Sequence, residues 1–169
     1  PMDFTDNLVL DTDAAIVDND TRWYDTNPTD TVISVGTNNE VNMASSTYVM
    51  YAWHSVEGYS KIGSYKGNAT RDGTFIYTGF RPAFVMIKNI TAAFDWVISD
   101  SARDPHNKVS RVLFPDNSGA EYYGADEYFA MDFCANGIKL RENDGWFSNA
   151  THYLYMAFAE TPFKYATAR

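Results

Sequence analysis

Cysteine is almost absent from this sequence of 169 residues. Cys134 is the single one, so no disulfide can form within the chain, and its place after Met131-Asp132-Phe133 predicts a small core residue. Apolar runs of about 18 residues are also missing, and the N-terminal PMDFTDN is acidic where a signal peptide would be basic. The sequence therefore predicts no membrane insertion, and its stability must come from packing or from oligomerisation.

Positive charge is scarce as well. The chain has 13 Lys and Arg against 22 Asp and Glu, a formal net charge of −9. This charge repels nucleic-acid phosphates and anionic membranes, so we expect no nucleic-acid partner. The three histidines, His54, His106 and His152, lie far apart, and none has a Cys or a second His at metal-ligand spacing. We therefore expect neither a metal site nor a cofactor.

Aromatic residues, by contrast, are abundant. They make up 16% of the chain, and short runs of β-branched and aromatic residues alternate with Gly, Asn, Asp and Pro. Such runs are typical of antiparallel sheets, so the sequence predicts an all-β chain, an antiparallel β-sandwich of the jelly-roll or concanavalin-like kind. The main expected strands are Thr31–Gly36, Thr47–Ser55, Tyr59–Tyr65, Thr74–Phe80, Ala83–Ile90, Phe94–Asp100, Lys108–Phe114, Tyr128–Cys134, Gly137–Arg141 and Thr151–Glu160.

The pattern also predicts which faces of two strands are buried. Ala83–Ile90 is apolar on both faces near its start, which indicates a strand covered on both sides. In the next strand Phe94, Trp96 and Ile98 alternate with polar residues, and we expect these three side chains to line the core.

The chain also repeats itself at a constant offset of 105 residues, since 113 − 8 and 157 − 52 both equal 105. The identical pairs are Leu8/Leu113, Asp11/Asp116, Ala15/Ala120, Ile33/Ile138, Asn38/Asn143, Tyr48/Tyr153 and Ala52/Ala157. A single register held over this span indicates an internal duplication. Residues 1–57 then form a partial first repeat, and residues 58–169 form a complete second one. We expect the partial repeat to add strands to one continuous sandwich over 1–169; the alternative is that the chain is the C-terminal piece of a longer protein.

Several long segments resemble an uncharacterised domain family of bacteriophage structural proteins. They are SKIGSYKGN, DGTFIYTGFRPAFVMIKN, DWVISDSARDP and FSNATHYLYMAFAETPFKY. The family is frequent in marine phages, in the C-terminal part of tail-fibre or host-recognition proteins, often behind concanavalin/laminin-G-like modules. The resemblance implies no catalytic residue.

Two groups of residues are candidate ligand-binding positions. Asp100, Arg103 and Asp104 are close in sequence and could hold a sugar hydroxyl or a Ca²⁺ ion, or else pin a turn through charge-assisted hydrogen bonds. Tyr122 and Tyr123, in a loop expected over Pro115–Glu127, could stack on sugar rings together with Trp146. The alternative for these aromatic residues is burial in the core.

The resemblance implies a non-enzymatic virion protein. We expect the distal, host-binding part of a tail fibre, a homotrimer that contacts other virion proteins and a host-surface glycan or protein. The alternative is a capsid decoration or cement protein, or a head-fibre protein, that stabilises the virion. No second carboxylate stands out as the partner that a glycosidase needs, so we expect no enzyme activity.

Overall fold

Two compact units of unequal size make up this chain. The computed structural model describes residues 2–3, 5–124 and 128–161. Unit 1 consists of Pro1–Val9 and Ile16–Trp53, and unit 2 consists of Leu10–Ala15 and His54–Arg169. The division after Trp53 lies near Glu57, where the sequence places the end of its partial repeat. The duplication itself stays a prediction, because the strands described in unit 1 are far shorter than those of unit 2.

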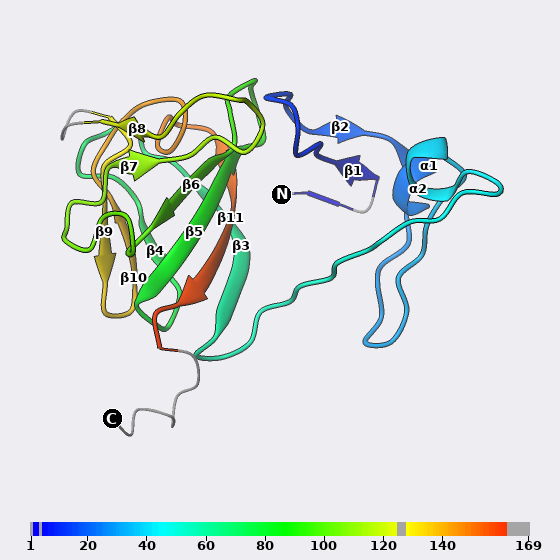
Figure 1. Cartoon of the computed structure of the whole chain (residues 1–169), viewed down its shortest axis with the longest axis horizontal. Coiled ribbons are helices and arrows are strands. Elements are labelled where there is room, and N and C mark those ends of the chain that lie inside the picture. The colour runs from blue at the N-terminus through cyan, green and yellow to red at the C-terminus, as the bar shows by residue number, and fades with distance from the viewer. Residues whose placement is uncertain (1, 4, 125–127, 162–169) are drawn as a thin grey trace. The chain divides into compact units, whose positions relative to one another are not determined.

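Unit 1 contains short elements joined by long connections (Figure 1). These elements are β1 (Asp6–Asn7), β2 (Val17–Asp18), α1 (Asp20–Trp23) and α2 (Asn39–Asn42). The two strands pair antiparallel. Each helix begins after an asparagine, Asn19 or Asn38, whose side chain accepts a backbone N–H of the first turn. The strands expected over Thr31–Gly36 and Thr47–Ser55 are wrong: among the described residues these segments have no ladder partner.

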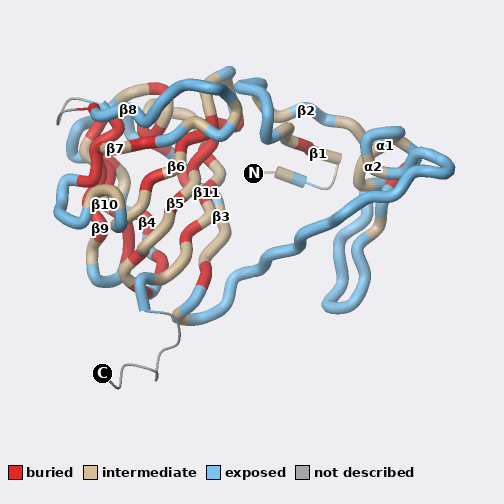
Figure 2. The backbone as a smooth tube through the Cα atoms, viewed as in Figure 1, coloured by how far each residue is buried: buried red, intermediate tan, exposed pale blue. Residues whose placement is uncertain are grey.

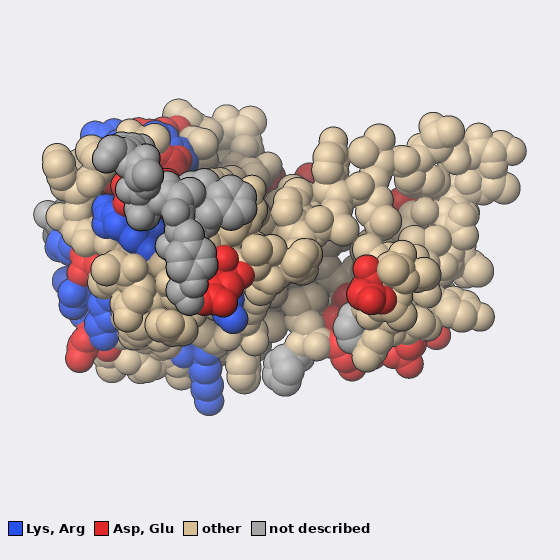
Figure 3. Space-filling model, turned by 90° about the horizontal axis from the view of Figure 1, so that it is seen from below, with Lys and Arg blue, Asp and Glu red and all other residues tan. Residues whose placement is uncertain are grey.

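The charge of unit 1 is strongly acidic. Its sequence holds one basic residue, Arg22, against six Asp and one Glu, so its formal charge is 1 − 7 = −6 and that of unit 2 is −9 − (−6) = −3. On the face drawn in Figure 3, Lys and Arg gather on unit 2 among Asp and Glu, whereas the charged residues seen on unit 1 are Asp and Glu. Arg22 bonds to Asn7 and to Glu40. It therefore ties β1 and α2 to α1.

Unit 2 is an antiparallel β-sandwich, as the composition predicted (Figure 1). The larger sheet has the order β3 (Ser60–Lys66), β11 (His152–Ala159), β5 (Pro82–Asn89), β6 (Val97–Asp100). The smaller sheet has the order β4 (Phe75–Tyr77), β10 (Gly137–Leu140), β9 (Met131–Cys134), and a separate ladder joins β7 (Arg111–Val112) to β8 (Tyr122–Tyr123). The sequence located β3, β5 and β11 to within one or two residues.

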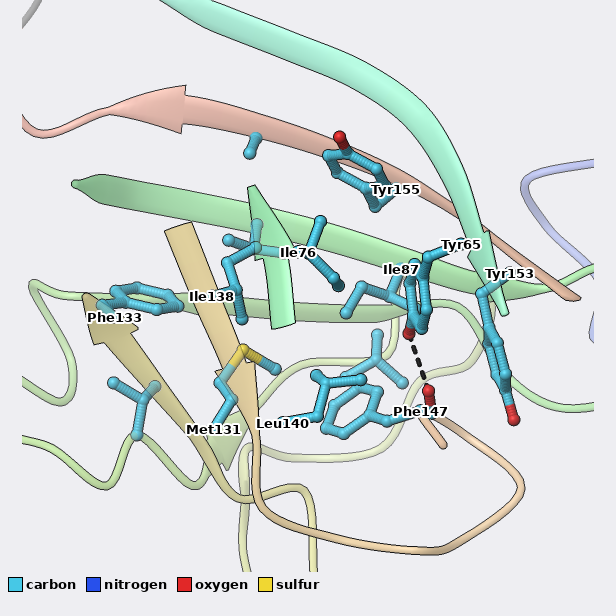
Figure 4. Close-up of a cluster of buried hydrophobic side chains, with 14 of the residues drawn as sticks. Tyr65, Ile76, Ile87, Met131, Phe133, Ile138, Leu140, Phe147, Tyr153 and Tyr155 are labelled. Atoms are coloured by element: carbon cyan, nitrogen blue, oxygen red, sulfur yellow. Dashed lines mark hydrogen bonds between the residues drawn. The ribbon is translucent and has the colours of Figure 1, made fainter. Parts of the chain in front are cut away.

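Buried residues lie along the strands of both sheets (Figure 2), and their side chains, most of them aromatic or branched, form one core cluster. From the larger sheet, Tyr153 has no exposed surface, and its ring stacks on Tyr65 with centroids 5.0 Å apart. The Tyr65 hydroxyl donates to the backbone carbonyl of Phe147 at 2.7 Å (Figure 4). The smaller sheet contributes Phe133 and Ile138, both almost fully buried. One core therefore holds the sandwich together.

Strand β5 is buried on both faces near its end rather than near its start, which corrects the sequence-based expectation. Phe84 is half-buried, whereas Lys88 has no exposed surface. Residues 10–15 cover this end, because the Lys88 Nζ donates to the carbonyls of Asp13 at 3.1 Å and Asn89 at 2.7 Å. Burial lowers the pKa of Lys88, although nearby carboxylates oppose this shift.

The alternation expected for Phe94–Asp100 has the wrong phase. Val97 and Ser99 are buried in the structure and Val97 belongs to the core, whereas Ile98 is half-buried on the opposite face. Pairing decides this, because Val97 lies opposite Ile87 of β5, whose side chain also faces the core. Trp96 is buried but does not belong to the main core cluster.

The turn before β11 depends on one buried carboxylate. The Asp144 Oδ1 accepts the backbone N–H groups of Trp146 and Phe147 at 2.9 and 3.1 Å. Burial raises the pKa of Asp144 above its usual value, and these backbone hydrogen bonds offset the shift only in part. Folding therefore disfavours the ionised form of this side chain.

We expect Asp144→Asn to stabilise the fold at neutral pH. The amide keeps the Oδ1 acceptor and removes the buried charge. Because folding raises the pKa of Asp144, the side chain is protonated and does not destabilise the fold at pH values below its unfolded-state pKa. Its destabilising effect grows as the pH rises from there through the folded-state pKa. Urea unfolding at several pH values should show the variant more stable at pH 7 and the two proteins converging at acidic pH. A difference that does not change with pH would contradict this account.

Candidate functional site

Within the loop predicted over Pro115–Glu127, Tyr122 and Tyr123 form the short strand β8, and residues 125–127 lie outside the described part of the chain. In the antiparallel ladder Arg111 lies opposite Tyr123 and Val112 lies opposite Tyr122. Residues paired in this way face the same side of a ladder, so the fully buried Val112 marks the inner side. Tyr122 therefore faces the body of unit 2 and Tyr123 faces away from it.

Tyr123 presents the more accessible ring of the two. Its side chain is 53% exposed, and the guanidinium of Arg111 lies 4.7 Å from the ring centroid. The cation covers one part of the ring and holds its orientation. Tyr122 is 43% exposed, and its ring meets Phe129 edge-on with centroids 5.4 Å apart. Tyr123 is therefore the better candidate for stacking on a ligand.

Charged side chains connect Tyr123 to the predicted Asp100–Arg103 group. Arg111 Nη1 lies 2.9 Å from Glu121 Oε1, and Arg103 Nη1 lies 3.8 Å from the other carboxylate oxygen of Glu121. Arg103 in turn contacts Asp100 Oδ2 through Nε at 2.6 Å and through Nη2 at 2.5 Å. The structure thus brings the two predicted groups into one surface network, which we call the β7–β8 site: Asp100, Arg103, Arg111, Glu121, Tyr122 and Tyr123.

The two predicted aspartates, Asp100 within this network and Asp104 next to it, hold the backbone. Asp100 Oδ1 accepts the N–H groups of Ala102 and Arg103. Burial by itself would raise the pKa of Asp100, but the hydrogen bonds and the charge of Arg103 outweigh it, so the pKa lies below its usual value. Asp104 Oδ2 accepts the N–H groups of Ser110 at 2.9 Å and Arg111 at 3.3 Å. These contacts are those of a turn pinned by charge-assisted hydrogen bonds, the alternative that the sequence left open.

Trp146 reaches the β7–β8 site through a chain of rings. Its ring lies 5.1 Å from Phe129, which also contacts Tyr122, and 5.2 Å from Phe94. The indole N–H donates to Asp95 Oδ2 at 3.3 Å. Trp146 is only partly exposed. Its position therefore suits support of the aromatic surface better than direct contact with a ligand.

The other candidates lie elsewhere. His54 and His152 belong to the beginning of unit 2 and to β11, and no group of three or more His, Cys, Asp or Glu within residues 2–3, 5–124 and 128–161 is arranged to hold a metal ion. Cys134 is half-buried at the end of β9 rather than in the core. No helix in the described part of the chain is long and apolar enough to cross a membrane.

Sequence reasoning missed Arg111 and Glu121, the two residues that join the predicted groups. Each is an ordinary charged residue in sequence, and 10 positions separate them. Their importance comes from the pairing of β7 with β8. No local signal within Lys108–Phe114 placed Tyr123 opposite Arg111.

The β7–β8 site offers a ring face, an arginine and a carboxylate on a surface held rigid by a ladder. Stacking on a ring, together with charged hydrogen-bond donors and acceptors at its edge, is an arrangement that suits polar ligands with apolar faces, such as sugar rings.

Comparisons with known proteins give one match. A family model described as Domain of unknown function (DUF7483) matches residues 2–162. Searches against curated proteins and against solved structures each found no significant match.

Proposed function

We propose the following function for this chain, which belongs to the DUF7483 domain family. The chain is a non-enzymatic structural protein of a bacteriophage virion, the distal part of a tail fibre that binds a glycan or protein on the host surface. The phage assignment comes from the sequence resemblance described above. The binding assignment comes from one observation, the exposed ring of Tyr123 held over Arg111.

The mechanism is adsorption. A rigid sandwich presents the β7–β8 site, and its ring face stacks on a sugar or an apolar side chain while Arg111 and Glu121 donate and accept hydrogen bonds at the edge. Single sites of this size bind weakly, so several copies on one particle supply the avidity. The chain acts with other virion proteins, as a homotrimer, and needs no cofactor.

Binding of fluorescently labelled protein to cells of each candidate host tests this function. Saturable binding that competes with intact phage supports the proposal. If a folded sample binds no host, the receptor-binding role is excluded, and the protein is then located on the particle by labelling.

Tyr123→Ala should weaken cell binding about 10-fold while the free energy of unfolding stays nearly unchanged. Loss of one aromatic stacking contact costs up to about 1.5 kcal/mol, which corresponds to roughly this factor. Tyr77→Ala is the matched control, because Tyr77 is 64% exposed on β4 and does not belong to the β7–β8 site. Equal binding by both variants would remove the β7–β8 site from the mechanism. Tyr122→Ala should lower binding too, with some loss of stability through Phe129.

A capsid decoration or cement protein is the second candidate, and one observation favours it. Residues 48–53 of unit 1 expose large apolar side chains, with Val49 at 80% and Tyr51 at 74%. Exposed apolar surfaces of this kind mark sites of interaction with other proteins. Labelling on the capsid rather than on the tail would select this function.

A further inference from the structure

Residues 48–53 have the sequence of a buried strand without the neighbours of one. Five of the six residues in this segment have large side chains that are at least 45% exposed: Tyr48, Val49, Met50, Tyr51 and Trp53. The described residues include no ladder partner for it. An apolar strand with open backbone edges is a ready template for pairing with another polypeptide.

At the offset of 105 this segment corresponds to β11. Tyr48 and Ala52 match Tyr153 and Ala157. In unit 2, β11 is a central strand, paired antiparallel with β3 on one side and with β5 on the other. The correspondence therefore predicts the two neighbours that residues 48–53 lack: one strand of the β3 type and one of the β5 type.

The structure contains an independent sign of the same correspondence. The Tyr153 hydroxyl accepts the N–H of Asn149 at 2.9 Å and donates to the carbonyl of Gly145 at 3.1 Å. The Tyr48 hydroxyl does the same in unit 1: it accepts the N–H of Met43 at 2.9 Å and donates to the carbonyl of Asn39 at 2.5 Å. Both tyrosines thus close the turn that leads into their own segment, and the backbone partners correspond at an offset of 106.

The residue that begins each turn makes an equivalent hydrogen bond as well. Asn38 Oδ1 accepts the N–H of Glu40 at 2.8 Å, and Asp144 Oδ1 accepts the N–H of Trp146 at 2.9 Å. These residues correspond at an offset of 106, whereas the sequence pairs Asn38 with Asn143 at 105, so the hydrogen bonds place this turn one residue later than the sequence offset does. The sequence offset and the hydrogen bonds are separate observations, and their alignments agree to within one residue.

A left-handed backbone position recurs too. Tyr24 has a φ of 60° and Phe129 a φ of 59°, and 129 − 24 = 105. Few residues other than glycine adopt this conformation. Its presence at equivalent positions extends the correspondence to the residues before the turn.

From these observations we infer that residues 48–53 form the central strand of a second sandwich, which is completed by a polypeptide segment like residues 58–105 of this chain. That segment supplies strands of the β3 and β5 types, which pair with the two edges of residues 48–53. Tyr48, Met50 and Ala52 then face the core, as Tyr153, Tyr155 and Ala157 do in unit 2. In the register of unit 2, Tyr48 lies between the equivalents of Tyr65 and Asn89.

A second copy of the chain folded in the same way does not meet this requirement. Its β5 is already paired on both sides, with β11 and β6, and its β3 has a single open edge. Such a copy can cover one edge of residues 48–53 but not both. The partner is therefore a segment whose β3-type and β5-type strands are both unpaired.

A fusion protein tests the inference. An extra copy of residues 58–105 is placed directly before Pro1 of the full chain, because position 1 corresponds to position 106 and the junction keeps the register. Amide hydrogen exchange is then followed by mass spectrometry. Exchange at residues 48–53 should be at least about 100-fold slower in the fusion protein than in the chain alone, with β11 as the protected internal reference.

Two variants of the fusion protein check the orientation of the strand. Met50→Asp places a charge on the core face and should abolish the protection, whereas Tyr51→Asp on the opposite face should leave most of it. Rapid exchange of residues 48–53 in the unmodified fusion protein, with β11 still protected, overturns the inference. Protection in the chain alone, accompanied by a dimer in ultracentrifugation, also overturns it, because the occupant is then a second copy.

Discussion

Tyr153→Ala should reduce the free energy of unfolding of unit 2 by about 3–5 kcal/mol, the range for removal of a large buried ring. Tyr153 has no exposed surface and stacks on Tyr65 at an angle of 11°. The substitution creates a cavity between the sheets. It also leaves the N–H of Asn149 and the carbonyl of Gly145 without their hydroxyl partner. Urea unfolding followed by near-ultraviolet circular dichroism measures the loss.

Two further variants separate the ring from its hydroxyl. Tyr153→Phe keeps the ring and should cost about 1–2 kcal/mol for the two lost hydrogen bonds. Tyr48→Ala is the matched control: Tyr48 makes the same pair of hydrogen bonds, but its side chain is 45% exposed, so we expect a loss below about 1 kcal/mol. Equal losses for Tyr153→Ala and Tyr48→Ala would show that burial of the ring does not stabilise unit 2.

Phe147→Ala should cost a similar amount, about 3–5 kcal/mol. The ring has no exposed surface and meets Phe129 edge-on with centroids 5.7 Å apart. Its backbone carbonyl accepts the Tyr65 hydroxyl, so movement of the backbone into the cavity would weaken this hydrogen bond as well. The measurement is again the urea midpoint and the slope of the transition.

The control for this position is Phe147→Leu, which fills most of the space and should cost less than about 1.5 kcal/mol if the core can repack. A loss below about 1 kcal/mol for Phe147→Ala would mean that this ring does not fill the core. The effect of both variants on the β7–β8 site should be small, because Phe147 acts there only through Phe129.

Prediction of strands from the sequence was most accurate where apolar and polar residues alternate along the strand and turn residues follow it. It located β3, β5 and β11 because each of these strands is long. It failed for Thr47–Ser55, which has the same alternation but no partner among the described residues. A strand exists only when its backbone groups pair, so alternation by itself predicts the capacity to form a strand rather than the strand.

The candidate site shows the same division. The sequence singled out Tyr122, Tyr123 and the Asp100–Arg103 group as separate possibilities, since aromatic residues and paired charges beside turns are visible in any sequence. Arg111 and Glu121 connect these separate groups into one network. These two residues act only through the register of β7 and β8.

The sequence by itself determined that this chain is all-β and that its core is aromatic. These properties depend on residue type and on local spacing, which are complete in the sequence. Only the tertiary structure decided that Val97 rather than Ile98 faces the core, that residues 10–15 cover Lys88, and that Tyr123 lies over Arg111. The physical reason is that pairing between distant segments sets which face of a strand is buried, and no local pattern contains that information.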